Sequence, residues 1–259
     1  MNINELCDDF LAERSDLIAV VEPLDELGWR AATPAPGWSV LDQVVHLAWF
    51  DDAARQAIVD PDAFRSHRAD VMGDVEFVDR IAAANRDRSG TDILAWLRRA
   101  ADGLVSAAQA ADLSIRVPWY GPDMSLASML TARIMETWAH GQDIVDTFGL
   151  SRTPTPRLRH VVFLGWKALA NSFRAHGRPV PEEPVRVEVG EWTFGPDDAS
   201  NVVRGPALDF CLVVTQRRHP ADTELVCEGT VAAEWLTIAQ AFAGPPGAGR
   251  QPGQFAERT

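Results

Sequence analysis

Lysine is nearly absent from this sequence: Lys167 is the only one among the 24 basic residues, and the others are arginines. We interpret this bias as the codon composition of a GC-rich genome, although it leaves room for an arginine-rich pocket that binds an anionic substrate. The net charge of -13 argues against a nucleic-acid surface, because phosphate neutralisation depends on clustered lysine and arginine. The sequence therefore predicts no nucleic-acid partner.

Cysteines and long apolar runs are also scarce. Cys7, Cys211 and Cys227 lie far apart and form no CxxC pair, so we expect reduced thiols and neither a disulfide framework nor a thiolate metal site. No apolar run reaches the roughly 18 residues that a membrane-spanning helix requires. The acidic N-terminal segment MNINELCDDFLAERSD lacks the basic and apolar parts of a signal peptide. These absences predict a cytoplasmic protein with no membrane partner.

The first two-thirds of the chain has apolar residues at helical spacing, with capping residues and helix-ending residues between the segments. Ser39 is a good N-cap for a helix that reaches Val59, where Asp60 and Pro61 end it, and Ser125 caps a helix that reaches Phe148. The other helices are expected over residues 3–27, 75–85, from Thr91 to about 105, and 155–175. We therefore expect a helical bundle over residues 1–177.

The pattern changes after Gly177. RPVPEEP is a linker, and VRVEV at residues 185–189 alternates with the period of a strand. GEWTFG continues in the same style, and LVCEG is a further strand between helices expected over residues 208–215 and 231–242. The fold class is therefore α+β, with a small α+β domain over residues 178–245. Residues 246–259 are rich in turn formers and predict a flexible tail.

A carboxylate and an imidazole share one face of the helix that follows Ser125. Glu136 and His140 are spaced i and i+4, which places their Cβ atoms roughly 5–6 Å apart on a helix. An ExxxH pattern occurs by chance in many helices, so a solvated pair or a core pair is the alternative interpretation.

His46 changes this balance. It lies among Val44, Val45, Leu47 and Trp49 on a helix that must be largely buried, where an imidazole needs polar partners. The alternative is a core histidine that is satisfied by hydrogen bonds. Together, two imidazoles and one carboxylate form a ligand set that leaves a coordination position open, as catalytic metal sites do. Zinc suits this set, and so do iron, nickel and cobalt.

These two segments carry a family resemblance. PGWSVLDQVVHLAWFDD, followed about 90 residues later by ARIMETWAHGQDIVD, resembles the DinB-like bundle of the mycothiol-dependent maleylpyruvate isomerase family. The resemblance covers about residues 5 to 175. It implies that His46, Glu136 and His140 bind a divalent metal ion, and Asp143 matches the acidic residue of the family motif.

The C-terminal part resembles the extra α+β domain of the same superfamily. VVRGPALDFCLVVTQRRH and GTVAAEWLTIAQAFAGPPG are similar to an actinobacterial metal-binding subgroup sometimes labelled wyosine base formation. That label implies tRNA modification, which the acidic charge does not support. The resemblance also implies a catalytic arginine in this domain, for which Arg204, Arg217 and Arg218 are the candidates.

Aromatic and acidic residues near the motifs are further candidates. Trp49, Trp119 and Tyr120 are expected to line the cofactor-binding pocket, with ordinary core packing as the alternative. Asp51 and Asp52 are candidates for the carboxylates that orient metal-bound imidazoles.

The function that follows is a metal-dependent thiol transferase or cis-trans isomerase. It would use mycothiol as a low-molecular-weight thiol and act on a small, electrophilic, anionic substrate. Two alternatives remain open: a hydrolase or lyase that uses metal-bound water, and a non-catalytic protein whose metal stabilises the bundle.

Overall fold

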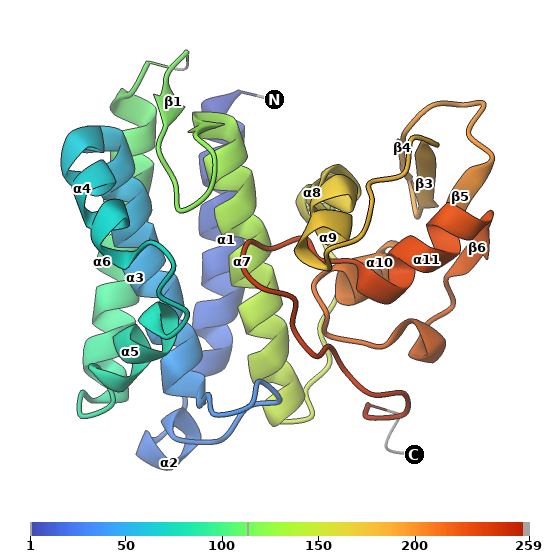
Figure 1. Ribbon diagram of the computed structural model, residues 1–259. Coiled ribbons are helices and arrows are strands. Elements are labelled where there is room, and N and C mark those ends of the chain that lie inside the picture. Colours follow the sequence, from blue (N-terminus) through green and yellow to red (C-terminus); the bar gives the residue numbers. More distant parts are fainter. Residues whose placement is uncertain (1, 113, 256–259) are drawn as a thin grey trace. The chain divides into compact units, whose positions relative to one another are not determined.

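The computed structural model describes residues 2–112 and 114–255, and it divides into two compact units, Met1–Arg152 and Thr153–Thr259. The first unit is helical and the second combines helices with a sheet, as the expected α+β class requires (Figure 1). None of the helices in the described ranges combines the length and apolar character that crossing a membrane demands.

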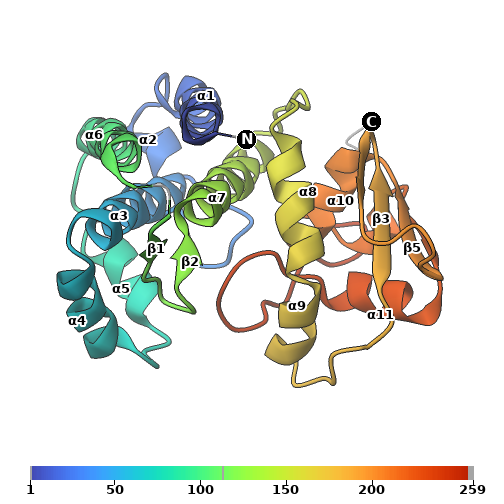
Figure 2. The same cartoon turned by 90° about the horizontal axis from the view of Figure 1, so that it is seen from above.

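The first unit is built on long helices that pack side by side. Helix α3 packs on α6 and α7, and α1 packs on α6 and α7, so that the four surround a common core (Figure 2). Short helices flank them, and a two-stranded antiparallel hairpin, β1 with β2, precedes α7. The elements are α1 (Ile3–Val21), α2 (Glu26–Trp29), α3 (Val40–Val59), α4 (Pro61–Val71), α5 (Phe77–Ala83), α6 (Gly90–Ala110), β1 (Arg116–Val117), β2 (Met124–Ser125) and α7 (Leu126–Thr147).

Capping side chains fix where the site-bearing helices begin. Ser39 accepts a hydrogen bond from the backbone N–H of Asp42, and the Asp42 carboxylate accepts one from the backbone N–H of Ser39. Ser125 accepts one from the backbone N–H of Ser128 at the start of α7. Both helix starts therefore agree with the sequence prediction.

Helix α4 is absent from the sequence prediction. The Asp60–Pro61 pair ends α3 as expected, but it also starts the next helix. The side chain of Asp60 accepts a hydrogen bond from the backbone N–H of Ala63, and Pro61 occupies the first helical position, where its missing N–H costs nothing. The expected helix over residues 3–27 is likewise divided into α1 and α2, because Asp25 caps a new helix.

The second unit contains a four-stranded sheet in the order β4–β3–β5–β6. Strands β3 and β5 pair in parallel, and the other neighbours are antiparallel. Val185, Val187 and Val189 of β3 are buried, while the residues between them are partly exposed. The elements are α8 (Leu158–Lys167), α9 (Leu169–Ala175), β3 (Val185–Val189), β4 (Trp192–Phe194), β5 (Asn201–Gly205), α10 (Ala207–Val214), η1 (Pro220–Asp222), β6 (Val226–Glu228) and α11 (Thr230–Ile238).

The division between the units lies at Arg152, whereas the sequence places residues up to 177 in the bundle. Helices α8 and α9 belong to the second unit because α8 packs on α10 and β4, and α9 packs on α11. Gly165 permits this contact, since a Cβ atom there would lie only 2.8 Å from the side chain of Val214.

The predicted flexible tail begins at residue 246. Its described part ends at residue 255, and residues 256–259 lie outside the described residues. Within the described part, the backbone N–H of Gly253 donates to the carboxylate of Asp222. The flexibility of this segment stays a prediction.

Candidate metal centre

Helices α3 and α7 bring His46, Glu136 and His140 together. One potential ligand atom from each residue lies within 4.8 Å of the other two. The Glu136 Oε2 atom is 3.2 Å from Nε2 of His140 and 3.7 Å from Nε2 of His46. The three side chains are only 12% to 21% exposed. Two distant segments of the sequence thus converge on one small, partly buried cluster.

His46 and Glu136 are in the protonation states that metal ligands need. Burial and the neighbouring His140 lower the pKa of His46 to about 3, so its imidazole is neutral. Burial acts to raise the pKa of Glu136, but the close contacts of its carboxylate with His140 and His46 hold that pKa well below its ordinary value. A neutral imidazole and an ionised carboxylate both offer lone pairs to a cation.

Gln43 supports the cluster, and the sequence analysis missed it. Its side-chain amide hydrogen-bonds Nδ1 of His140 through Oε1. The amide nitrogen donates to Thr33 Oγ1 at 2.9 Å and to Asp143 Oδ2 at 3.5 Å. Gln43 precedes His46 by one helical turn, and this spacing on a buried helix was the available signal.

Asp51 and Asp52 do not orient the imidazoles. Asp51 accepts hydrogen bonds from Arg14 and from Arg133 Nε, the latter at 2.9 Å, and all three side chains are buried. Asp52 accepts a hydrogen bond from Trp96 Nε1 at 2.6 Å. The expectation for this pair was wrong because Asp51 is needed to neutralise buried arginines from α1 and α7.

Aromatic rings enclose the cluster on two sides. The ring of Trp38 stacks on that of His140 with centroids 5.9 Å apart, and its centroid lies 5.5 Å from that of His46. The Phe50 centroid lies 4.5 Å from that of His46. These contacts leave apolar walls beside the ligand atoms.

Trp49, Trp119 and Tyr120 lie one ring further away. Tyr120 contacts both Trp49 and Trp119, and Phe50 links them to the cluster, with its centroid 5.6 Å from that of Tyr120. Burial raises the pKa of Tyr120. A cofactor at the cluster would have to extend past Phe50 to contact these three residues. Their role in cofactor binding stays a prediction.

Comparison with known proteins identifies the family of this chain. Residues 10–145 match the sequence model of the mycothiol maleylpyruvate isomerase N-terminal domain. The chain belongs to this family. The resemblance inferred from the two motifs is thereby confirmed.

Relatives and solved structures agree with this assignment. Two uncharacterized proteins from two strains of Mycobacterium tuberculosis are each 41% identical over 248 residues, which is 93% of this chain and 96% of theirs. A crystal structure of the mycothiol-dependent maleylpyruvate isomerase matches with a TM-score of 0.61 at 15% identity, over 84% of this chain and 90% of that chain. A structure of its histidine-to-alanine variant gives 0.62 at 15% identity, over 88% and 93%. At this identity, the structural likeness concerns the fold.

The candidate catalytic arginines of this family member all lie in the second unit. Arg204 binds Glu188 at 2.6 Å and Glu228 at 2.5 Å on the sheet surface, so its guanidinium is engaged by two carboxylates. Arg217 donates to the backbone oxygen of Thr215 at 2.6 Å. These contacts make Arg204 the weakest candidate for binding a substrate anion.

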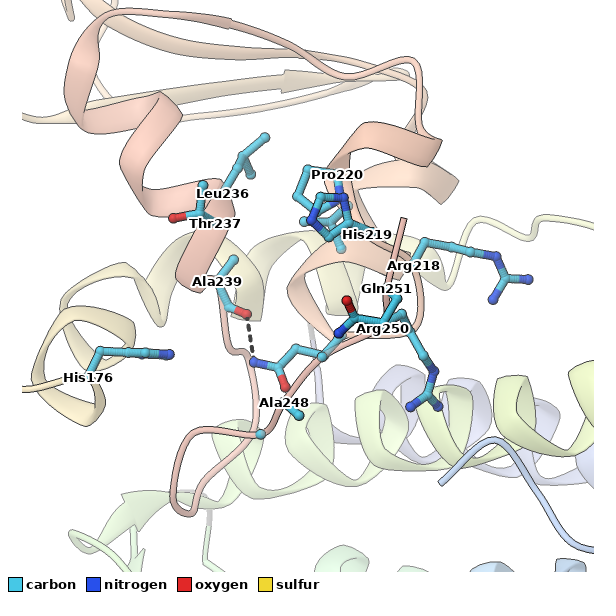
Figure 3. Close-up of a pocket in the computed structure, with 14 residues that line it drawn as sticks. His176, Arg218, His219, Pro220, Leu236, Thr237, Ala239, Ala248, Arg250 and Gln251 are labelled. Atoms are coloured by element: carbon cyan, nitrogen blue, oxygen red, sulfur yellow. Dashed lines mark hydrogen bonds between the residues drawn. The ribbon is translucent and has the colours of Figure 1, made fainter. Parts of the chain in front are cut away.

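Arg218 lines a pocket of about 210 Å³ within the second unit. Its guanidinium lies 4.1 Å from the ring centroid of Phe255. In Figure 3 the guanidinium groups of Arg218 and Arg250 extend away from Leu236 and Thr237, which form another part of the pocket wall. Arg217 and Arg218 remain predicted catalytic residues.

Proposed function

We propose that this chain is a metal-dependent enzyme that uses mycothiol to transfer or isomerise a small, electrophilic, anionic substrate. The convergence of His46, Glu136 and His140 within 4.8 Å carries the proposal. Membership in the mycothiol maleylpyruvate isomerase family supports the thiol.

The donor set fits a divalent metal ion. Two imidazoles and one carboxylate suit zinc, and they also suit iron, nickel and cobalt. Nδ1 of His46 is buried and finds no hydrogen-bond partner among the described residues, so this imidazole needs a partner that the protein itself does not supply. Three protein ligands leave coordination positions for a small molecule.

The chemistry requires a thiolate at neutral pH. A divalent ion bound by these residues acts as a Lewis acid that lowers the pKa of a coordinated thiol. Glu136 and the two histidines would hold the ion. Trp38 and Phe50 exclude water from two sides of the cluster. We assign the substrate's anionic group to Arg217 or Arg218, each of which offers a permanent positive charge.

Isomerisation needs no other reagent. The thiolate forms a C–S bond to one carbon of a conjugated double bond, which becomes a single bond as its electrons move toward the carbonyl. Rotation about that bond is followed by breakage of the C–S bond, which restores the double bond and releases the thiolate. In a transferase the C–S bond instead persists after the adduct takes up a proton.

The test is thiol dependence. Purified protein loaded with zinc is given maleylpyruvate, with and without mycothiol, and the substrate is followed by absorbance and the free thiol by a colorimetric assay. We expect turnover only with mycothiol, and its loss in His46→Ala, while Arg98→Ala, which removes an exposed arginine paired with Glu22, keeps it. Turnover in thiol-free buffer would identify a hydrolase or lyase that uses water, and would overturn the thiol proposal.

A second measurement distinguishes the proposed enzyme from a non-catalytic protein whose metal stabilises the bundle. Water relaxation with cobalt or manganese in place of zinc reports whether solvent exchanges at the metal. A site closed to solvent and to mycothiol, in a protein that unfolds when the metal is chelated, would support a structural metal and contradict the enzyme.

A further inference from the structure

A surface depression of about 450 Å³ adjoins the candidate metal centre within the first unit. Trp38 belongs to both features: it lines the depression, and its ring stacks on that of His140. The lining residues are Arg30, Ala32, Gly37, Trp38, Ser39, Asp42 and Arg86. The function proposed above leaves this depression without a role.

The charges around the depression are balanced. Arg86 Nε binds the carboxylate of Asp42 at 3.0 Å, and this contact raises the pKa of Arg86. Arg30 lies 3.5 Å from a carboxylate oxygen of Glu26. Because each arginine has an acidic neighbour, an anion would gain little net attraction here.

The same arginines are held in fixed positions by the backbone. Arg30 donates to the carbonyl oxygens of Arg86 at 2.6 Å and Arg88 at 2.7 Å. Arg86 also donates to the carbonyl oxygen of Gly37 at 3.0 Å. A guanidinium has five N–H donors, so each of these retains donors beyond the contacts described. Pre-positioned donors lose little conformational entropy when they bind a ligand.

An aromatic surface combined with neutralised donors and acceptors suits a particular class of ligand. Hydroxyl groups both donate and accept, so they can pair with guanidinium N–H groups and with the hydroxyl oxygen of Ser39. The apolar C–H face of a saturated ring can pack on an indole ring. A neutral, hydroxylated ring meets both requirements. A carboxylate or phosphate carries a charge that the balanced arginines do not attract, and it has no apolar face to pack on the indole ring.

We propose that this depression binds a neutral, polyhydroxylated ring, a sugar or cyclic polyol, and that Trp38, Arg30 and Arg86 determine its affinity. The identity of this ring rests on the function proposed above: it is the hydroxylated part of mycothiol. The thiol of mycothiol then extends past Trp38 toward His46 and His140. The Trp38 centroid lies 5.5 Å and 5.9 Å from the two imidazole centroids, so one ring separates the depression from the ligand cluster.

The experiment uses an analogue of mycothiol in which alanine replaces the cysteine, so that binding does not depend on sulfur. Its affinity for the full chain is measured by titration calorimetry, beside N-acetylcysteine and inorganic phosphate. Arg30→Met and Arg86→Met are each expected to weaken the analogue by about tenfold, the value of a lost hydrogen bond to a charged donor. Neither is expected to change metal content or the affinity for N-acetylcysteine.

Arg98→Met is the matched control, because Arg98 is an exposed arginine paired with Glu22 and does not line the depression. It should bind the analogue as the unaltered chain does. Circular dichroism and the melting temperature establish that each variant is folded, and Trp38→Phe, which keeps an aromatic ring, serves as a milder change that should weaken the analogue less than Arg30→Met.

Failure of this proposal and failure of the proposed function give different results. Unchanged analogue affinity in folded Arg30→Met and Arg86→Met, in a chain whose turnover depends on mycothiol, would overturn the ring site alone. Competition by inorganic phosphate would also overturn it, since that result requires an anion site. Analogue binding that these variants weaken, in a chain without mycothiol turnover, would support the ring site and contradict the function.

Discussion

Gln43 Oε1 accepts a hydrogen bond from Nδ1 of His140. The amide orientation follows from its other partners, because the carboxylate of Asp143 can only accept and therefore faces the amide nitrogen. His140 consequently carries its proton on Nδ1, and the lone pair on Nε2 faces Glu136. A side chain that contacts no metal position itself thus sets which nitrogen is free to bind one.

Replacing Gln43 by leucine is expected to weaken metal binding by about 10- to 100-fold, since residues that orient metal-bound histidines typically contribute that much. Competition with a chromophoric chelator measures the affinity. Gln43→Glu keeps an acceptor opposite Nδ1 but loses the N–H donor that faces Asp143, so its affinity should lie between those of the leucine variant and the unaltered chain. Equal affinities of the leucine variant and the unaltered chain would show that His140 needs no such partner.

Asp51 is expected to be essential for stability. It neutralises Arg14 and Arg133, which are 1% and 2% exposed. Asp51→Ala leaves two buried cations without their carboxylate, so the free energy of unfolding should fall by about 3–5 kcal/mol in urea titrations. Glu22→Ala, which breaks the exposed pair with Arg98, should change it little.

Metal binding should stabilise the fold. Zinc at a hundredfold excess over its dissociation constant is expected to raise the free energy of unfolding by about 2.7 kcal/mol, provided that the unfolded chain does not bind it. Urea unfolding with zinc and with a chelator measures the difference. His140→Ala should show the same stability in both buffers, and a zinc effect that persists in this variant would place the ion elsewhere.

Gly165 tests the packing of the second unit. A Cβ atom there would lie 2.8 Å from the Val214 side chain and 3.0 Å from that of Phe210, so α8 and α10 would have to move apart. Gly165→Ala is expected to cost about 1–3 kcal/mol, as overpacked cores do. Gly121→Ala is the control, because no atom outside its neighbours lies within 4 Å of the added Cβ. Equal stability of both variants would contradict the close helix contact.

Local signals in the sequence were sufficient for the main helices and for the convergence of His46, Glu136 and His140. Ser39 and Ser125 marked the true starts of α3 and α7, because capping depends on residues within one turn. The i, i+4 spacing of Glu136 and His140 fixed their shared face. His46 was recognisable because a histidine on an otherwise apolar helix needs a partner.

Other features depend on partners that lie far away in the sequence. The orientation of His140 by Gln43 joins residues 97 positions apart, and the pairing of Asp51 with Arg133 joins residues 82 apart. Strand β5 was missed because its partner β3 is not the strand that precedes it in the sequence, which is β4. Its own burial pattern does not alternate either. The boundary at Arg152 was missed because nothing within α8 reveals that α10 covers it.

Metal content measures the central claim most directly. Elemental analysis of the purified chain should find about one divalent ion per chain, as a three-ligand site holds, and the double variant His46→Ala, His140→Ala should hold none. His67→Ala, which removes a partly buried histidine outside the cluster, serves as the control and should keep the full amount. Unchanged metal stoichiometry in the double variant would contradict the assignment of His46, Glu136 and His140 as ligands.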